Sequence, residues 1–158
     1  THPAARLLMV TDEAVSDRHP WCAMPGVEVW WDADATRAQR ALATAAVAVL
    51  PRTDATGFPM KLLNYLAAAK PIVAFHGAAQ GLRPGRDALV VPDGDIAGFA
   101  AAITAALSDV ALRQRLGEAA RALVDAGAAD ATLDRIESIY RRVLAHTAPH
   151  LVPVPQPE

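Results

Sequence analysis

The sequence contains a single cysteine, Cys22, and aromatic residues make up only 5% of its 158 residues. One cysteine excludes an internal disulfide framework and a zinc site built from cysteines. No apolar run approaches the roughly 20 residues that a membrane-spanning helix needs. Neither sign of charge dominates, because 15 Lys and Arg residues stand against 17 Asp and Glu residues. That near balance argues against a nucleic acid or an anionic membrane as the partner.

Alanine and the larger aliphatic residues dominate the composition of the chain. Hydrophobic residues make up 53% of the chain, and 36 of the 158 residues are alanine. Short apolar runs alternate with stretches of helical composition, and runs such as 46–50 are apolar on both faces, as in parallel strands covered by helices. The sequence therefore predicts an α/β fold with a doubly wound, Rossmann-like parallel sheet. The strands are expected at 6–10, 27–30, 46–50, 72–75 and 88–91, with helices between them at 35–44 and 60–69.

The last third of the chain is expected to be helical. Asp95 and Asp109 can cap helices over 96–107 and from 109 to about 124, because aspartate is favoured at that position. Thr132 can cap a final helix with an apolar stripe. We expect one domain over residues 1–146, followed by an extended, proline-rich tail over 147–158.

The segment 51–61 joins the third expected strand to its helix and gathers several functional residue types. In an open parallel sheet, ligands bind at the carboxyl ends of the strands, and the amides that begin a helix favour an anion. Gly57 permits close backbone approach, and Pro59 suits a first helical turn. Lys61 and Asn64 share a helix face and offer a charge for phosphate and an amide for a sugar hydroxyl. The pattern indicates a phosphate-and-ribose site, although a solvated lysine and asparagine at a helix edge also fit the spacing.

Four segments then follow in a characteristic order. They are GFPMKLLNYLAAAKPIVAF (57–75), GLRPGRDALVVPDGDIAGFAAAITAALSD (81–109), LRQRLGEAARALV (112–124) and IESIYRRVL (136–144). Together they resemble the nucleotide-sugar-binding, C-terminal domain of GT-B glycosyltransferases, of the family 4-like, group 1 type. The resemblance covers residues 6 to 144, and it implies the GT-B Rossmann-like fold and the binding of a nucleotide-sugar donor.

The resemblance also implies roles for individual residues. Asn64 stands where the family has a carboxylate that binds ribose, and Thr56 stands where it has a second glutamate, so the paired-glutamate signature is incomplete here. Met60, Lys61 and Asn64 resemble instead the Met-Lys-x-x-Gln motif of xanthan-type glucuronosyltransferases. By that resemblance Met60 packs against the nucleotide, Lys61 neutralises phosphate and Asn64 holds the ribose. The backbone from Gly57 to Met60 would cradle the diphosphate.

Two further residues are expected beside the nucleotide. Trp31 follows the second strand, where the family has its nucleobase-contacting turn, although a buried or interface aromatic residue would fit there as well. His76 follows the fourth strand and is expected to line the same cleft. The substrate-binding residues expected in this chain are Thr56, Gly57, Phe58, Pro59, Met60, Lys61, Asn64, Trp31 and His76.

The implied reaction is transfer of a sugar from a UDP- or GDP-sugar to a hydroxyl of a saccharide or lipid-linked acceptor. Lys61 and the helix start would stabilise the leaving phosphate, with no metal ion and no cofactor beyond the nucleotide sugar. We expect an acceptor-binding domain and a first strand–helix unit to precede residue 1. We also expect a cytoplasmic location, with any peripheral contact to the inner face of the plasma membrane made through the other domain.

Two other functions remain open at this stage. Thr56 and Asn64, which replace the glutamates, fit a non-catalytic GT-B-like module for binding or regulation. A sugar-nucleotide epimerase of the same fold is the second alternative.

Overall fold

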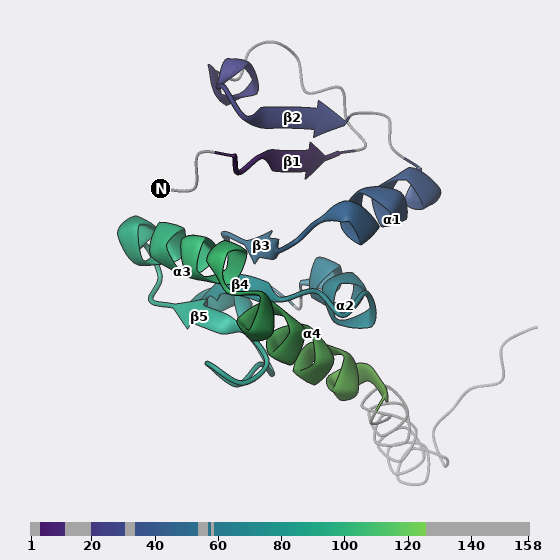
Figure 1. Ribbon diagram of the computed structural model, residues 1–158, viewed down its shortest axis with the longest axis vertical. Coiled ribbons are helices and arrows are strands. Elements are labelled where there is room, and N and C mark those ends of the chain that lie inside the picture. Colours follow the sequence, from purple (N-terminus) through teal and green to yellow (C-terminus); the bar gives the residue numbers. More distant parts are fainter. Residues whose placement is uncertain (1–3, 12–19, 31–33, 54–56, 58, 126–158) are drawn as a thin grey trace, which may run out of the picture.

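The computed structural model describes residues 4–11, 20–30, 34–53, 57 and 59–125 (Figure 1). The expected final helix and the tail over 147–158 lie outside the described residues. Within them, every expected strand and helix is present to within two or three residues at either end. The strands are β1 (Leu7–Val10), β2 (Val27–Trp30), β3 (Ala48–Leu50), β4 (Ile72–Phe75) and β5 (Leu89–Val91). The helices are α1 (Ala35–Thr44), α2 (Met60–Ala67), α3 (Ile96–Ser108) and α4 (Val110–Asp125), with 3-10 turns η1 (Pro20–Ala23) and η2 (His76–Ala78).

The strands are parallel, as predicted, but they form two sheets instead of one continuous sheet. β1 pairs with β2, and β3, β4 and β5 form a separate three-stranded sheet in that order. Figure 1 shows the two-stranded sheet beyond β3, with α1 leading from one sheet to the other. The two sheets also differ in burial, because every residue of β4 is buried while every residue of β1 remains at least partly exposed. β1 and β2 therefore lack the cover on both faces that a central strand receives.

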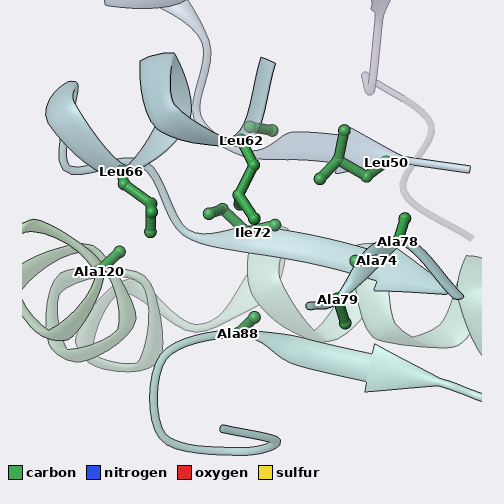
Figure 2. Packing of buried hydrophobic residues seen from close by; sticks show 10 residues of the cluster. Leu50, Leu62, Leu66, Ile72, Ala74, Ala78, Ala79, Ala88 and Ala120 are labelled. Atoms are coloured by element: carbon green, nitrogen blue, oxygen red, sulfur yellow. The ribbon is translucent and has the colours of Figure 1, made fainter. Parts of the chain in front are cut away.

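Helices cover both faces of the three-stranded sheet. On one face, α2 and α4 pack over β3 and β4 through Leu62, Leu66 and Ala120 (Figure 2). On the other face, α3 packs over β4 and β5, where the rings of Phe75 and Phe99 lie 4.5 Å apart. Ile72 and Val73, which are neighbours on β4, are fully buried in opposite clusters. This alternation of apolar side chains on both faces confirms the α/β class.

Three aspartates cap helix starts, and the sequence predicts two of them, Asp95 and Asp109. Asp34 accepts a hydrogen bond from the amide of Arg37 at 2.7 Å, and Asp95 accepts one from Gly98 at 2.8 Å. Asp109 accepts one from Leu112 at 2.9 Å. Each bond satisfies an amide that the first turn of a helix would otherwise leave open.

The turn between α2 and β4 is clamped by α4. Ala69 has a φ of 52°, a left-handed conformation that costs an L-residue with a side chain. Gly117 of α4 lies so close that a β-carbon there would sit 2.3 Å from the carbonyl oxygen of Ala69. Arg121, one turn later, donates to the carbonyl of Ala67 at 2.8 Å. The position of α2 therefore depends on α4.

An ion pair between the half-exposed Arg83 and the buried Asp87 holds the loop before β5. Asp87 is fully buried, and it accepts hydrogen bonds from Nε of Arg83 at 2.7 Å, from Nη2 at 2.9 Å and from the backbone amide at 3.1 Å. Burial alone would raise the pKa of Asp87, but the hydrogen bonds and charge of Arg83 outweigh it and lower the pKa. This ion pair fixes Arg83 within the loop that it belongs to.

Candidate functional site

Three chain segments converge at the carboxyl ends of β3, β4 and β5. They are residues 51–53, η2 and the turn 92–95, and together we call them the carboxyl edge. Gly77 of η2 lies against Thr53, so closely that a β-carbon there would sit 2.3 Å from the Thr53 carbonyl oxygen. The Gly77 amide also donates to Oδ1 of Asp93 at 2.8 Å. One glycine thus joins the segments that follow all three strands, at the place where open parallel sheets bind ligands.

The acidic residues of this edge hold the backbone in position. Asp93 binds the Gly77 amide, and Asp95 caps α3. Among the described residues, no group of three His, Cys, Asp or Glu side chains is placed to hold a metal ion. The carboxylates here therefore act as supports for the segments that surround the site.

A hollow of about 430 Å³ opens at the carboxyl ends of β4 and β5. His76, which is exposed, and Asp93 contribute its polar side chains, and Pro84, Val90, Val91 and Pro92 provide apolar walls. The structure thus places His76 in a hollow at the predicted edge. This hollow combines an apolar surface with a few polar groups, as small-molecule sites do.

Helix α2 follows the first of these segments in the chain and has its polar residues turned away from the core. Leu62 and Leu66 are buried against the sheet, whereas Met60, Lys61 and Asn64 are exposed. The side chains of Lys61 and Asn64 form no hydrogen bond or ion pair with another described residue, and neither lines the hollow beside His76. Their side chains are accessible to a ligand from outside the sheet, and their binding roles stay predictions.

The start of α2 carries no side-chain cap from its N-cap residue, Pro59. Pro59 itself is buried, and Gly57 before it is exposed with a φ of 75°. Glycine reaches this left-handed conformation without the steric cost of a side chain. Thr56 and Phe58 lie outside the described residues, as does Trp31, so their predicted contacts stay predictions.

A second hollow, of about 560 Å³, lies at the carboxyl end of β2, and the sequence analysis did not identify it. Trp30, Asp34, Thr36, Arg37 and Arg40 line it. The guanidinium of Arg37 lies 5.2 Å from the centre of the Trp30 ring, a cation–π distance. The indole of Trp30 donates to Glu28 at 2.7 Å. The sequence does contain one indication of this hollow. Arg37 and Arg40 are three residues apart after a capping aspartate, a spacing that places both cations on one face of a helix.

No single helix in the described part of the chain is long and apolar enough to cross a membrane. Only α3 and α4 taken together meet the length and composition that a span requires, and they meet at a bend of 102°.

Comparison with known proteins assigns the chain to a family. A model of the family described as "Glycosyl transferases group 1" matches residues 2–109. An exopolysaccharide phosphotransferase from Streptomyces coelicolor is 34% identical over 106 residues, which are 65% of this chain and 11% of that protein. Sucrose-phosphate synthase from Thermosynechococcus elongatus has a similar fold, with a TM-score of 0.67 at 24% identity over 77% of this chain and 31% of that structure. The chain thus spans about a tenth of the curated relative and less than a third of the solved structure.

Proposed function

Because the chain belongs to the group 1 glycosyl transferase family, we propose that it is the donor-binding domain of an enzyme that uses a UDP- or GDP-sugar. The enzyme transfers the sugar to a hydroxyl of a saccharide or of a lipid-linked acceptor. The observation that carries this proposal is the carboxyl edge, where Gly77 joins the segments following three parallel strands and from which the chain leads into α2. A helix start next to strand ends favours a diphosphate through its amides and its dipole.

The diphosphate binds at the start of α2 in this proposal. The backbone from Gly57 to Met60 surrounds it, and the exposed ammonium of Lys61 neutralises its charge. Negative charge grows on the leaving nucleotide as the bond to the sugar breaks, so a fixed cation stabilises the transition state more than the ground state. Lys61 is therefore the residue with the largest expected effect on the rate, and the reaction proceeds without a metal ion.

The nucleoside and the sugar lie on either side of the diphosphate. Asn64, one turn further along α2, hydrogen-bonds the ribose through its amide, and Met60, 68% exposed, packs against the nucleotide. His76 faces the transferred sugar from the hollow at the ends of β4 and β5. The resemblance of Met60, Lys61 and Asn64 to the xanthan-type motif supports a glucuronosyl donor, which is the finer form of the proposal.

The rest of the reaction belongs to other parts of the protein. An acceptor-binding domain, N-terminal to this one, closes the cleft and supplies the group that activates the acceptor. The relative named an exopolysaccharide phosphotransferase supports a saccharide acceptor and a role in polysaccharide synthesis. The proposed location is the cytoplasm, with any membrane contact made by the other domain.

Replacement of Lys61 tests the proposal in the full-length protein. Lys61→Ala should lower kcat/KM about 10- to 1,000-fold, since one charge-assisted contact in the transition state contributes about 1.5–4 kcal/mol. Lys61→Arg, which keeps the charge, should recover part of the loss. Gln114→Ala changes an exposed polar residue of α4 and serves as the matched control. An unchanged rate in Lys61→Ala would remove this residue from the site.

A binding module without catalytic activity is the second candidate, and Asn64 in place of a carboxylate favours it. Calorimetry with UDP, GDP and their sugars separates the two functions. Saturable binding without transfer in the full-length protein indicates the module, whereas binding with transfer indicates the enzyme. No saturable heat with millimolar ligand contradicts donor binding in either form.

A further inference from the structure

Residues 83–86 form a hydrogen-bonded turn with an arginine at each end. Their sequence is Arg-Pro-Gly-Arg, and the amide of Arg86 donates to the carbonyl of Arg83 at 3.1 Å. Gly85 has a φ of 73°, and a proline before such a glycine is typical of a type II turn. This geometry keeps the Cα atoms of the first and last residues within about 7 Å of each other. The arginine turn, as we call residues 83–86, therefore carries two cationic side chains at neighbouring backbone positions.

Arg115 brings a third guanidinium to the arginine turn from helix α4. Its Nη1 donates to the carbonyl of Gly85 at 2.9 Å, although 30 residues separate the two in the chain. Arg115 is exposed, and this bond uses one of the five N–H groups of its guanidinium. Glu118, three residues further along α4, is exposed and forms no ion pair with another described residue. The charge of Arg115 thus has no acidic partner in the part of the chain that the structure describes.

Asp87 is the acidic residue that follows the arginine turn, and Arg83 already occupies it. The Asp87 side chain is fully buried, whereas that of Arg83 is 50% exposed. Burial raises the pKa of Asp87, but the hydrogen bonds of Arg83 and then the charges of Arg83 and Arg86 lower it, so both cations lie near this carboxylate. The side chain of Arg86 is exposed and forms no hydrogen bond or ion pair with another described residue. Three arginines and one carboxylate therefore leave an excess of two positive charges.

The arginine turn is held in its conformation by its own backbone. The Asp87 amide donates to the carbonyl of Arg83 at 3.0 Å, and the Arg83 amide donates to Oδ2 of Asp87 at 3.1 Å. The Gly85 amide donates to the carbonyl of Ala88 at 2.8 Å. Apart from its chain neighbours, no described residue lies within 4 Å of the place that a β-carbon on Gly85 would take, so the turn is open on that side. An anion that binds here therefore has little chain entropy to overcome.

We propose that the arginine turn and Arg115 together bind a phosphate group. A phosphate monoester carries about 1.5 to 2 negative charges at neutral pH, which matches the local excess of positive charge. This excess is local, because the net charge of the whole chain is −2. Guanidinium groups bind phosphate oxygens through paired N–H donors, and clusters of arginine are a recurrent means of recognising phosphate. The site shares no residue with the start of α2, and the proposal is independent of donor binding there.

Calorimetry of the full-length protein with inorganic phosphate at low salt tests this proposal. Arg86→Gln breaks no hydrogen bond between described residues and should weaken phosphate binding about 10-fold or more, because a contact between charged groups is lost. Arg115→Gln should also weaken binding, and Arg86→Lys, which keeps the charge, should recover part of the loss. Arg6→Gln is the matched control, since it removes the same charge from an exposed side chain that pairs with Glu28.

Vesicles distinguish a lipid headgroup from a soluble phosphate as the source of the bound group. Vesicles of phosphatidylcholine with phosphatidic acid present a phosphate monoester, and vesicles of phosphatidylcholine alone are the control. Binding of inorganic phosphate that depends on Arg86 would support a soluble ligand. Co-sedimentation with phosphatidic acid that depends on Arg86, without binding of the free ion, would support a headgroup. If Arg86→Gln altered neither measurement more than Arg6→Gln does, the proposal would be overturned.

Discussion

Gly77→Ala should disrupt the carboxyl edge while leaving the sheet folded. The added β-carbon would sit 2.3 Å from the carbonyl oxygen and 2.9 Å from the carbonyl carbon of Thr53, distances that no side-chain rotation can relieve because both atoms are backbone. Overpacking of this kind costs about 1–3 kcal/mol. To relieve the contact, residues 51–53 and η2 must move apart by about 1 Å, and misplacement of that size reduces catalysis about 100-fold.

Gly117→Ala is the matched control for this prediction. Its β-carbon would meet the carbonyl oxygen of Ala69 at the same 2.3 Å, at the opposite end of α2 from the carboxyl edge. Urea denaturation should show similar losses of stability for the two variants. Calorimetry with UDP and GDP should show that Gly77→Ala weakens nucleotide binding much more than Gly117→Ala. If the two variants bound nucleotide with equal affinity, the carboxyl edge would not be the binding site.

Three further predictions concern stability. Ala69→Gly should raise the free energy of unfolding by about 0.5–1 kcal/mol, because it relieves a left-handed φ of 52° at some cost in chain entropy; a lower thermal midpoint would contradict this. Asp87→Asn should cost about 1–3 kcal/mol at neutral pH. The pKa of Asp87 is lowered in the folded state, so the stability that its carboxylate contributes is present above the unfolded pKa of about 3.9 and is lost as the pH falls through the folded value. Urea titrations should therefore show that the free energy of unfolding depends less on acidic pH in the variant. Lys70→Met should cost about 1–2 kcal/mol, since the Lys70 ammonium donates to the carbonyls of Ala43 and Ala45 at 2.8 and 2.9 Å at the end of α1; an unchanged urea midpoint would show that water replaces these bonds.

The sequence predicted the elements well because local signals and burial agreed. The run 72–75 is apolar on both faces, and β4 is buried on both faces. The helix expected at 35–44 is α1 with the same limits, because Asp34 caps its start and the extended backbone of Ala45 ends it. The strands β3 and β5 are shorter than predicted. The pairing partner decides where a strand begins, and composition does not reveal that partner.

The arrangement of the sheets and the second hollow could not be predicted. Apolar pattern identifies β1 and β3 as strands but contains no information on which edges meet, so the division into two sheets came only from the structure. The hollow at β2 depends on Arg37 lying across Trp30, a contact that requires the packing of α1. At the carboxyl edge, the role of Gly77 could not be predicted because it is a close approach to Thr53, and only coordinates reveal such an approach.

The family match ends at residue 109, one residue before α4 begins, and this limit matters for any shortened version of the protein. A chain cut at residue 109 would keep every predicted ligand-binding residue. It would lose Ala120, which packs in one cluster with Leu62 and Leu66 of α2, and Arg121, which donates a hydrogen bond to the end of α2. In the shortened chain, Lys61 would then belong to a helix that is held less firmly. The smallest functional unit therefore includes α4, which supports α2, as well as the residues that contact the ligand.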